Sequence, residues 1–107
     1  MIDYAEAQAA CETYIRSLQA SDVETLLALF EDNASIEDPV GTALREGKSA
    51  LREFYSVACE GVLSAALSGA PRLAGNEVAF PFTVTAGTVG EELTINIIDV
   101  FKFNEAG

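Results

Sequence analysis

The alternation that decides the fold reads Leu93-Thr94-Ile95-Asn96-Ile97-Ile98-Asp99-Val100-Phe101-Lys102-Phe103. Every odd position in this run is apolar except Asp99. Because successive side chains of a β-strand point to opposite sides, a period of two predicts a strand whose apolar face includes Asp99. An ionised carboxylate on a buried face is unfavourable by several kcal/mol unless it is paired, so Asp99 should be neutral or partnered there. A register shifted by one residue would place the same side chain in solvent.

The rest of the second half also predicts extended structure. Residues 78–85 alternate, and their apolar face carries Val78, Phe80, Phe82 and Val84. Pro81 lies on the other face and indicates a sheet edge or a bulge, because proline has no backbone N–H to donate. Residues 62–67 predict a weaker strand, and residues 86–90 predict the turn into the strand of Asp99.

The first half predicts three helices and one short strand. Apolar residues three and four positions apart define three inner stripes: Tyr4, Ala7, Cys11, Tyr14 and Leu18; Val23, Leu26, Leu27 and Phe30; Leu51, Phe54, Tyr55 and Ala58. Ser21 with Glu24 forms a capping-box pattern that begins the second helix, and Gly47 precedes the third. Residues 34–38 predict a strand that Pro39 ends. Helices followed by an antiparallel sheet predict an α+β domain with helices covering one sheet face.

The composition limits the classes of partner. The chain has 107 residues, half of them hydrophobic, which suits one globular domain over residues 1–107. Six Lys and Arg against 17 Asp and Glu give a net charge of −11, which disfavours nucleic acid and anionic membrane surfaces as partners. No apolar run reaches the roughly 20 residues of a transmembrane helix, and the first residues do not resemble a secretory signal. We therefore expect a cytoplasmic protein.

The chain contains no histidine, which excludes Ser-His-Asp and Cys-His catalysis and removes the commonest metal ligand. Cys11 and Cys59 belong to no CxxC pair, so the sequence predicts two buried free thiols rather than a zinc site or a disulfide. Any proton chemistry must then depend on carboxylates, tyrosines or lysine.

Four polar side chains fall on apolar stripes or at their ends: Tyr14, Asp38, Tyr55 and Asp99. Each has a structural alternative, because a stripe tyrosine can be a core residue and an aspartate before proline can be a turn residue. Together they suit one reaction class, in which a carboxylate removes a proton next to a carbonyl. A tyrosine and a neutral carboxyl would then stabilise the developing oxyanion, with no metal or organic cofactor.

Three segments carry a resemblance to a known family. They are Phe30-Glu31-Asp32-Asn33-Ala34-Ser35-Ile36-Glu37-Asp38-Pro39-Val40-Gly41, Gly47-Lys48-Ser49-Ala50-Leu51-Arg52-Glu53-Phe54-Tyr55 and Ile98-Asp99-Val100-Phe101-Lys102-Phe103-Asn104. In this order and spacing they resemble the bacterial Δ5-3-ketosteroid isomerases. That family also supplies a familiar example of a carboxylic acid kept neutral by an apolar site, so the idea about Asp99 is not independent of the resemblance.

The resemblance implies an NTF2-like cone, in which helices and a bent sheet enclose a deep apolar pocket. It implies that Asp38 moves a proton from C4 to C6 of a Δ5-3-ketosteroid, while Tyr14 and protonated Asp99 donate hydrogen bonds to the C3 oxygen. Tyr55 would support Tyr14, and Phe30 stands where some members have a further tyrosine. Candidates for lining the steroid site, each of which could equally be ordinary core, are Phe54, Phe80, Phe82, Val84 and Phe101.

The resemblance also concerns the end of the sheet and the partners. Family members continue after the Phe-Asn-x-x-Gly turn with another strand, whereas this sequence ends at Gly107 within that turn. We therefore expect the strand of Asp99 to have an unpaired edge unless another segment or chain covers it. Family members are dimers, and Ile98 and Val100 could serve that contact.

Two alternatives remain for the function. One is an NTF2-like binding protein or another enzyme for a polycyclic or terpenoid ligand, and the other is a non-catalytic dimerisation domain.

Overall fold

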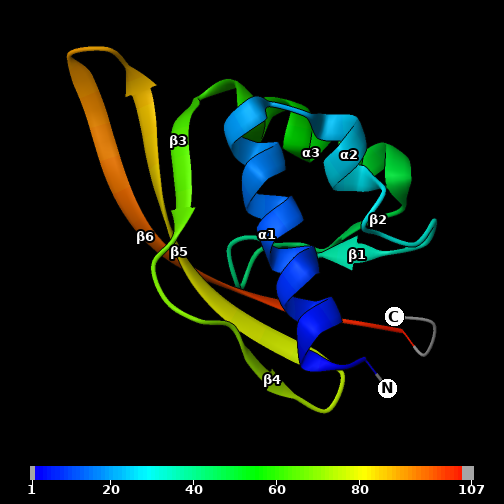
Figure 1. Ribbon diagram of the computed structural model, residues 1–107. Coiled ribbons are helices and arrows are strands. Elements are labelled where there is room, and N and C mark those ends of the chain that lie inside the picture. Colours follow the sequence, from blue (N-terminus) through cyan, green and yellow to red (C-terminus); the bar gives the residue numbers. More distant parts are fainter. Residues whose placement is uncertain (1, 105–107) are drawn as a thin grey trace.

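The computed structural model describes residues 2–104 of the chain and confirms the α+β fold (Figure 1). In chain order the elements are α1 (Tyr4–Ala20), α2 (Val23–Leu27), β1 (Ser35–Ile36), β2 (Arg45–Glu46), α3 (Lys48–Glu60), β3 (Val62–Leu67), β4 (Arg72–Ala74), β5 (Glu77–Thr88) and β6 (Glu91–Lys102). The three predicted helices and the strands β3, β5 and β6 are present. The short strands β2 and β4 were not predicted.

The helix α1 begins where Asp3 accepts a hydrogen bond from the Glu6 backbone N–H at 2.8 Å. Its predicted inner stripe is buried from Ala7 to Leu18, but Tyr4 is 43% exposed and reaches the Pro71 carbonyl instead. The capping box predicted for the second helix is wrong. Ser21 ends α1 with a φ of 54°, and Asp22 caps α2 by accepting from the Thr25 N–H at 3.1 Å.

The strand β5 lies at the centre of the larger sheet. It pairs with β6 along one edge, and with β4 and then β3 along the other, antiparallel in each case. Pro81 falls between the β4-paired and β3-paired parts, and its carbonyl accepts from the Ser68 N–H at 3.0 Å. The predicted edge or bulge at Pro81 is therefore a gap in the hydrogen-bond ladder on one side of a central strand.

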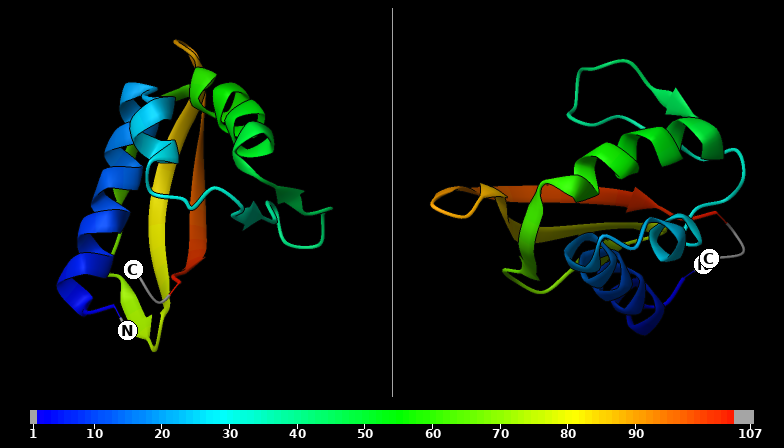
Figure 2. Two further views of the ribbon diagram at one scale, coloured as in Figure 1. Left: turned by 90° about the vertical axis from the view of Figure 1, so that its right-hand side faces the viewer. Right: turned by 90° about the horizontal axis from the view of Figure 1, so that it is seen from above.

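The strands β5 and β6 form one long bent ribbon, which extends past the helices at its hairpin end (Figure 2). The turn between them is shorter than predicted, because β5 continues to Thr88. Val89 is 89% exposed at this tip, and Leu93 is 64% exposed although it belongs to the apolar face. The helix-covered half of the ribbon is thus the half that can form a closed site.

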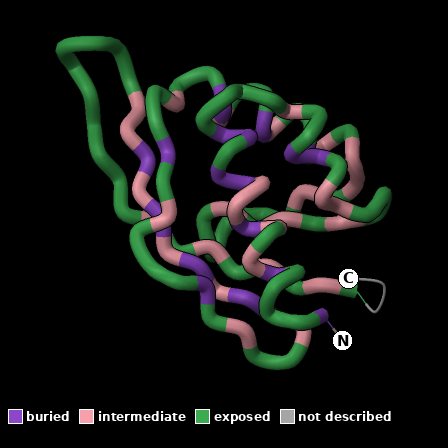
Figure 3. The backbone as a smooth tube through the Cα atoms, in the orientation of Figure 1, coloured by how far each residue is buried: buried purple, intermediate pink, exposed green. Residues whose placement is uncertain are grey.

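Buried positions recur along α1 and β5 (Figure 3). The predicted β5 face, Val78, Phe80, Phe82 and Val84, is buried throughout. Cys11 and Cys59 are buried free thiols, as predicted. Within residues 2–104, none of the helices combines the length and the apolar character that a membrane-crossing helix requires.

The outer edge of β6 has no strand partner among the described residues. Phe103 continues from β6 and donates its backbone N–H to the Asn76 carbonyl at 2.8 Å. The predicted turn at the end of the chain lies, beyond Asn104, outside the described residues. Ile98 and Val100 project from the other sheet face and are exposed, so the dimer contact proposed for them stays a prediction.

Candidate active site

Asp99 lies on the half-buried face of β6, as the alternation predicts. Its neighbours on this face, Ile97 and Phe101, are half-buried, whereas Ile98 is 71% exposed on the opposite face. Across the ladder, Asp99 stands directly opposite Phe80, which is completely buried. The register that would have placed Asp99 in solvent is excluded.

This environment favours the neutral form of Asp99. Burial, and secondarily the negative charge of Asp38, raise the pKa of Asp99 from its ordinary value of 3.8 to about 6. The Tyr14 hydroxyl acts in the opposite direction, because a donor stabilises the carboxylate form. An aspartate of this kind is protonated in mildly acidic solution and can then donate a hydrogen bond.

Tyr14 comes from the middle of α1 and is 2% exposed. Phenylalanine rings surround it edge-on, with Phe101 closest at 5.0 Å between centroids, followed by Phe80 at 5.8 Å and Phe82 at 6.2 Å. Its hydroxyl lies 3.1 Å from the hydroxyl of Tyr55. Burial, and after it the charge of neighbouring groups, raise the pKa of Tyr14 well above its ordinary value, so the hydroxyl keeps its proton.

Tyr55 lies on the buried face of α3 and is the second member of this hydrogen-bonded pair of hydroxyl groups. Burial raises its pKa above the ordinary value, and the hydrogen bond with Tyr14 opposes that effect. Phe54 packs against it at 5.0 Å between ring centroids and Phe30 at 6.0 Å. Because Phe30 has no hydroxyl, the hydrogen-bonded pair does not extend in that direction.

Asp38 follows β1, two residues beyond the end of the strand at Ile36, so the predicted strand over residues 34–38 is too long. It is half-buried. Burial raises the pKa of Asp38, and the positive charge of Arg45 lowers it. Asp38 in turn raises the pKa of Tyr14, Tyr55 and Asp99, so the structure brings the four predicted polar side chains within electrostatic reach.

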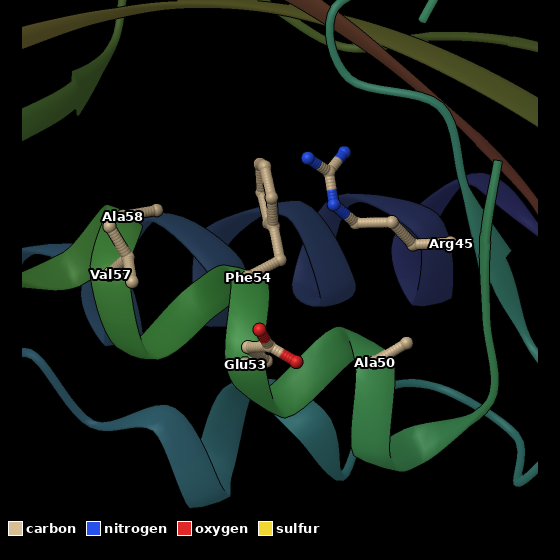
Figure 4. A pocket seen from close by; sticks show the side chains of 6 residues that line it. All are labelled: Arg45, Ala50, Glu53, Phe54, Val57 and Ala58. Atoms are coloured by element: carbon tan, nitrogen blue, oxygen red, sulfur yellow. The ribbon is translucent and has the colours of Figure 1, made fainter. Parts of the chain in front are cut away.

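An open pocket of about 430 Å³ lies along α3, and the four polar side chains are not among the residues that line it (Figure 4). It is lined by Arg45, Ala50, Glu53, Phe54, Val57 and Ala58. Phe54 and Arg45 connect it to the polar group, because Phe54 packs on Tyr55 and Arg45 Nη1 donates to the Asp38 carbonyl at 3.4 Å.

The predicted lining set is only partly found in this pocket. Phe54 belongs to the pocket, whereas Phe80, Phe82 and Val84 are core residues outside its lining, and Phe101 is half-buried beside Tyr14. The other lining residues were missed: Arg45, Ala50, Glu53 and Val57 lie on no predicted apolar stripe, and Ala58 lies on one but was not expected at the site. Within residues 2–104, no group of three or more Cys, Asp or Glu side chains is arranged to hold a metal ion.

Helices packed on a bent antiparallel sheet define an NTF2-like protein. The family model described as the SnoaL-like domain matches residues 11–107, and the chain belongs to this family. Over 103 residues it is 32% identical to the steroid Delta-isomerase of Nocardioides simplex, covering 96% of this chain and 83% of that protein. The resemblance stated from the three sequence segments is therefore confirmed.

Solved structures agree with the fold. The structure of SalBIII, described as an epoxide hydrolase/cyclase-like enzyme in pyran ring formation in the polyether salinomycin, matches with a TM-score of 0.86 and 27% identity, over 100% of this chain and 87% of that one. RV0760c from Mycobacterium tuberculosis matches with a TM-score of 0.82 and 22% identity, over 99% and 86% of the two chains. At that identity, the second likeness concerns the fold alone.

Proposed function

We propose that this protein is a steroid Δ-isomerase, which converts a Δ5-3-ketosteroid into the conjugated Δ4 isomer by moving a proton from C4 to C6. One observation carries the proposal: Tyr14, Asp38 and Asp99, from three distant parts of the chain, lie close enough together that the charge of Asp38 raises the pKa of both other groups. The likeness to a steroid Delta-isomerase supports the substrate class. Arg45 and Phe54, which contact Asp38 and Tyr55, line an open pocket of about 430 Å³, and this volume lies within the usual range for small-molecule sites, roughly 300–1,000 Å³.

Asp38 acts as the base. Half-burial raises its pKa, which makes it a stronger base, and Arg45 keeps the carboxylate form accessible. The carboxylate removes the C4 proton next to the C3 carbonyl, leaving a dienolate. The same group, now a carboxylic acid, returns the proton to C6, so no other acid is required.

Tyr14 and Asp99 act as the two donors to the C3 oxygen. Tyr14 keeps its proton, Asp99 is a donor in its protonated form, and each such oxyanion donor lowers a barrier by about 3–4 kcal/mol. A bound steroid displaces water from Asp99 and raises its pKa beyond the value of about 6 in the free protein, which favours the donor form. We propose that in the substrate complex the Tyr55 hydroxyl donates to Tyr14 across their 3.1 Å contact, which leaves the Tyr14 proton for the C3 oxygen.

A second candidate is another proton-transfer reaction on a polycyclic or terpenoid ligand. The structural likeness to the cyclase-like enzyme SalBIII favours it, since the same base and two donors can serve ring formation. The two candidates differ in product: an isomerase forms an enone from a Δ5-3-ketosteroid, and a cyclase does not.

The test is to incubate the protein with a Δ5-3-ketosteroid and to follow the ultraviolet absorbance of the conjugated enone. We expect Asp38→Asn to lose nearly all turnover while it retains steroid affinity, because the amide keeps the shape of the side chain but cannot accept the proton. Asp32→Asn, which changes an exposed carboxylate on the same connecting segment, is the matched control. Equal turnover in the wild type and Asp38→Asn would refute the assignment of the base.

A further inference from the structure

Arg45 connects three parts of the proposed site. It begins β2, where it pairs with Ile36 of β1, two residues before Asp38. Its guanidinium Cζ lies 4.7 Å from the centroid of the Phe54 ring on α3. From this position its Nη1 donates to the backbone carbonyl of Asp38 at 3.4 Å. The planar guanidinium of Arg45 thus contacts the Phe54 ring with its face and the Asp38 carbonyl with its edge. These two contacts connect α3 to the Asp38 loop.

The position of this cation is unusual for the chain. The sequence has six Lys and Arg against 17 Asp and Glu, and Arg45 is the basic residue that lines the pocket. Arg52, one turn along α3 from Lys48, is a contrast, because it is largely exposed and pairs with Glu24. Figure 4 shows the Arg45 and Phe54 side chains standing together on one side of α3, with Glu53 on another.

We propose that Arg45 is a positioning residue for Asp38: its guanidinium, held against Phe54, fixes the Asp38 loop and keeps a positive charge beside the carboxylate. The inference rests on the proposed role of Asp38 as the base. It adds that the geometry and the ionisation of this base depend on a residue that does not touch the reacting carbons.

The groups around Asp38 explain why a cation is needed there. The charge of Asp38 raises the pKa of Asp99 on β6, of Tyr14 on α1 and of Tyr55 on α3. Burial and a carboxylate neighbour both disfavour the ionised form of an aspartate. Arg45 acts in the opposite direction and lowers the pKa of Asp38. Without Arg45, Asp38 would stay protonated up to a higher pH, so it could not act as a base over a wider range of pH.

Three variants test the inference: Arg45→Gln, Arg45→Lys and, as a matched control, Arg52→Gln. The first measurement is the titration of the Asp38 carboxyl carbon by NMR in the free protein. We expect the pKa of Asp38 to rise in Arg45→Gln, to stay near the wild-type value in Arg45→Lys and to be unchanged in Arg52→Gln. Lysine keeps the charge but lacks the planar group that bridges Phe54 and Asp38.

The second measurement is the pH profile of turnover on a Δ5-3-ketosteroid. In Arg45→Gln the acid limb of kcat/KM should move to higher pH. Arg45→Lys should keep the acid limb but lose about tenfold in kcat, less than the roughly 100-fold that a misplacement of one ångström can cause. An unchanged Asp38 titration in Arg45→Gln, or full activity with an unshifted limb, would overturn the inference. If the wild type has no turnover while the Asp38 titration still shifts in Arg45→Gln, the isomerase proposal alone is refuted.

Discussion

Replacing Asp99 by Asn should stabilise the protein near neutral pH and have little effect in acid. The pKa of Asp99 in the folded protein, about 6, lies above its ordinary value of 3.8. The folded state therefore binds this proton more tightly than the unfolded state does. The resulting stabilisation is fully present below pH 3.8 and is lost as the pH rises through about 6. Asparagine resembles the neutral carboxyl at every pH, so the Asp99→Asn variant keeps this stabilisation as the pH rises.

The magnitude follows from the two pKa values. Their difference, 6 minus 3.8 or about 2.2, corresponds to about 3 kcal/mol at 1.36 kcal/mol per pH unit. Asp99 is only partly buried, and solvent screening reduces this to about 1–2 kcal/mol. Relative to the wild type, Asp99→Asn should therefore gain about 1–2 kcal/mol in free energy of unfolding between pH 4 and pH 7.

Urea unfolding of both proteins at pH 4, 5, 6 and 7 measures this gain, because the carboxylates that are not coupled to Asp99 titrate equally in both and cancel. Glu91→Gln is the matched control, an exposed acid-to-amide change on the same strand. A difference between wild type and Asp99→Asn that is constant with pH, or that equals the Glu91→Gln difference, would refute the reasoning. The pKa of Asp99 would then not be raised by its position opposite Phe80.

Two further predictions concern the aromatic part of the site. Tyr55→Phe removes the hydroxyl 3.1 Å from Tyr14 and should lower kcat by about three- to tenfold with unchanged steroid affinity, measured by enone formation and by equilibrium binding. Loss of affinity without loss of kcat would contradict a supporting role. Phe80→Ala empties a completely buried position and should lower the free energy of unfolding by about 3–5 kcal/mol, while Val89→Ala at the exposed hairpin tip should have little effect. Similar urea midpoints for both variants would contradict the placement of Phe80 in the core.

The half-buried strand of Asp99 could be predicted from the sequence because its alternation is long and its one exception is charged. A burial preference repeated over many residues fixes the register, and the structure places Asp99 opposite Phe80 accordingly. The same pattern could not show that Leu93 is exposed, because local periodicity carries no information about where the covering helices end.

The second helix shows where local signals fail. Ser21 and Asp22 are both good capping residues, and the capping-box spacing favours Ser21. In the structure, the Ser21 hydroxyl donates to the carbonyl of Cys59, 38 positions away, and Asp22 caps α2. The contact of Ser21 with Cys59 therefore decides which of the two residues caps α2. The sequence around residues 21–24 contains no sign of this long-range contact. The three residues of β4 are likewise too few to show a period.

The burial of the β5 phenylalanines also shows what the sequence cannot predict about the site. Alternation predicts that Phe80 and Phe82 are buried, but it cannot distinguish a side chain covered by a ligand from one covered by Tyr14. The structure covers both with the Tyr14 ring. Arg45 was missed for the opposite reason, because its contact with Phe54 depends on the pairing of β1 with β2, which no apolar stripe reports.

The two aspartates of the site differ most in what stands beside each of them. Asp38 has the guanidinium of Arg45, whereas Asp99 has the ring of Phe80 opposite and the charge of Asp38 nearby. Burial raises the pKa of both carboxyls, but the cation opposes that rise at Asp38 whereas a like charge adds to it at Asp99, so their pKa values are pushed apart. In the proposed mechanism Asp38, which loses its proton first, is the base, and its charge helps to keep the proton on Asp99. The acid and base roles that the proposed isomerisation needs thus follow from the neighbours of two chemically identical side chains.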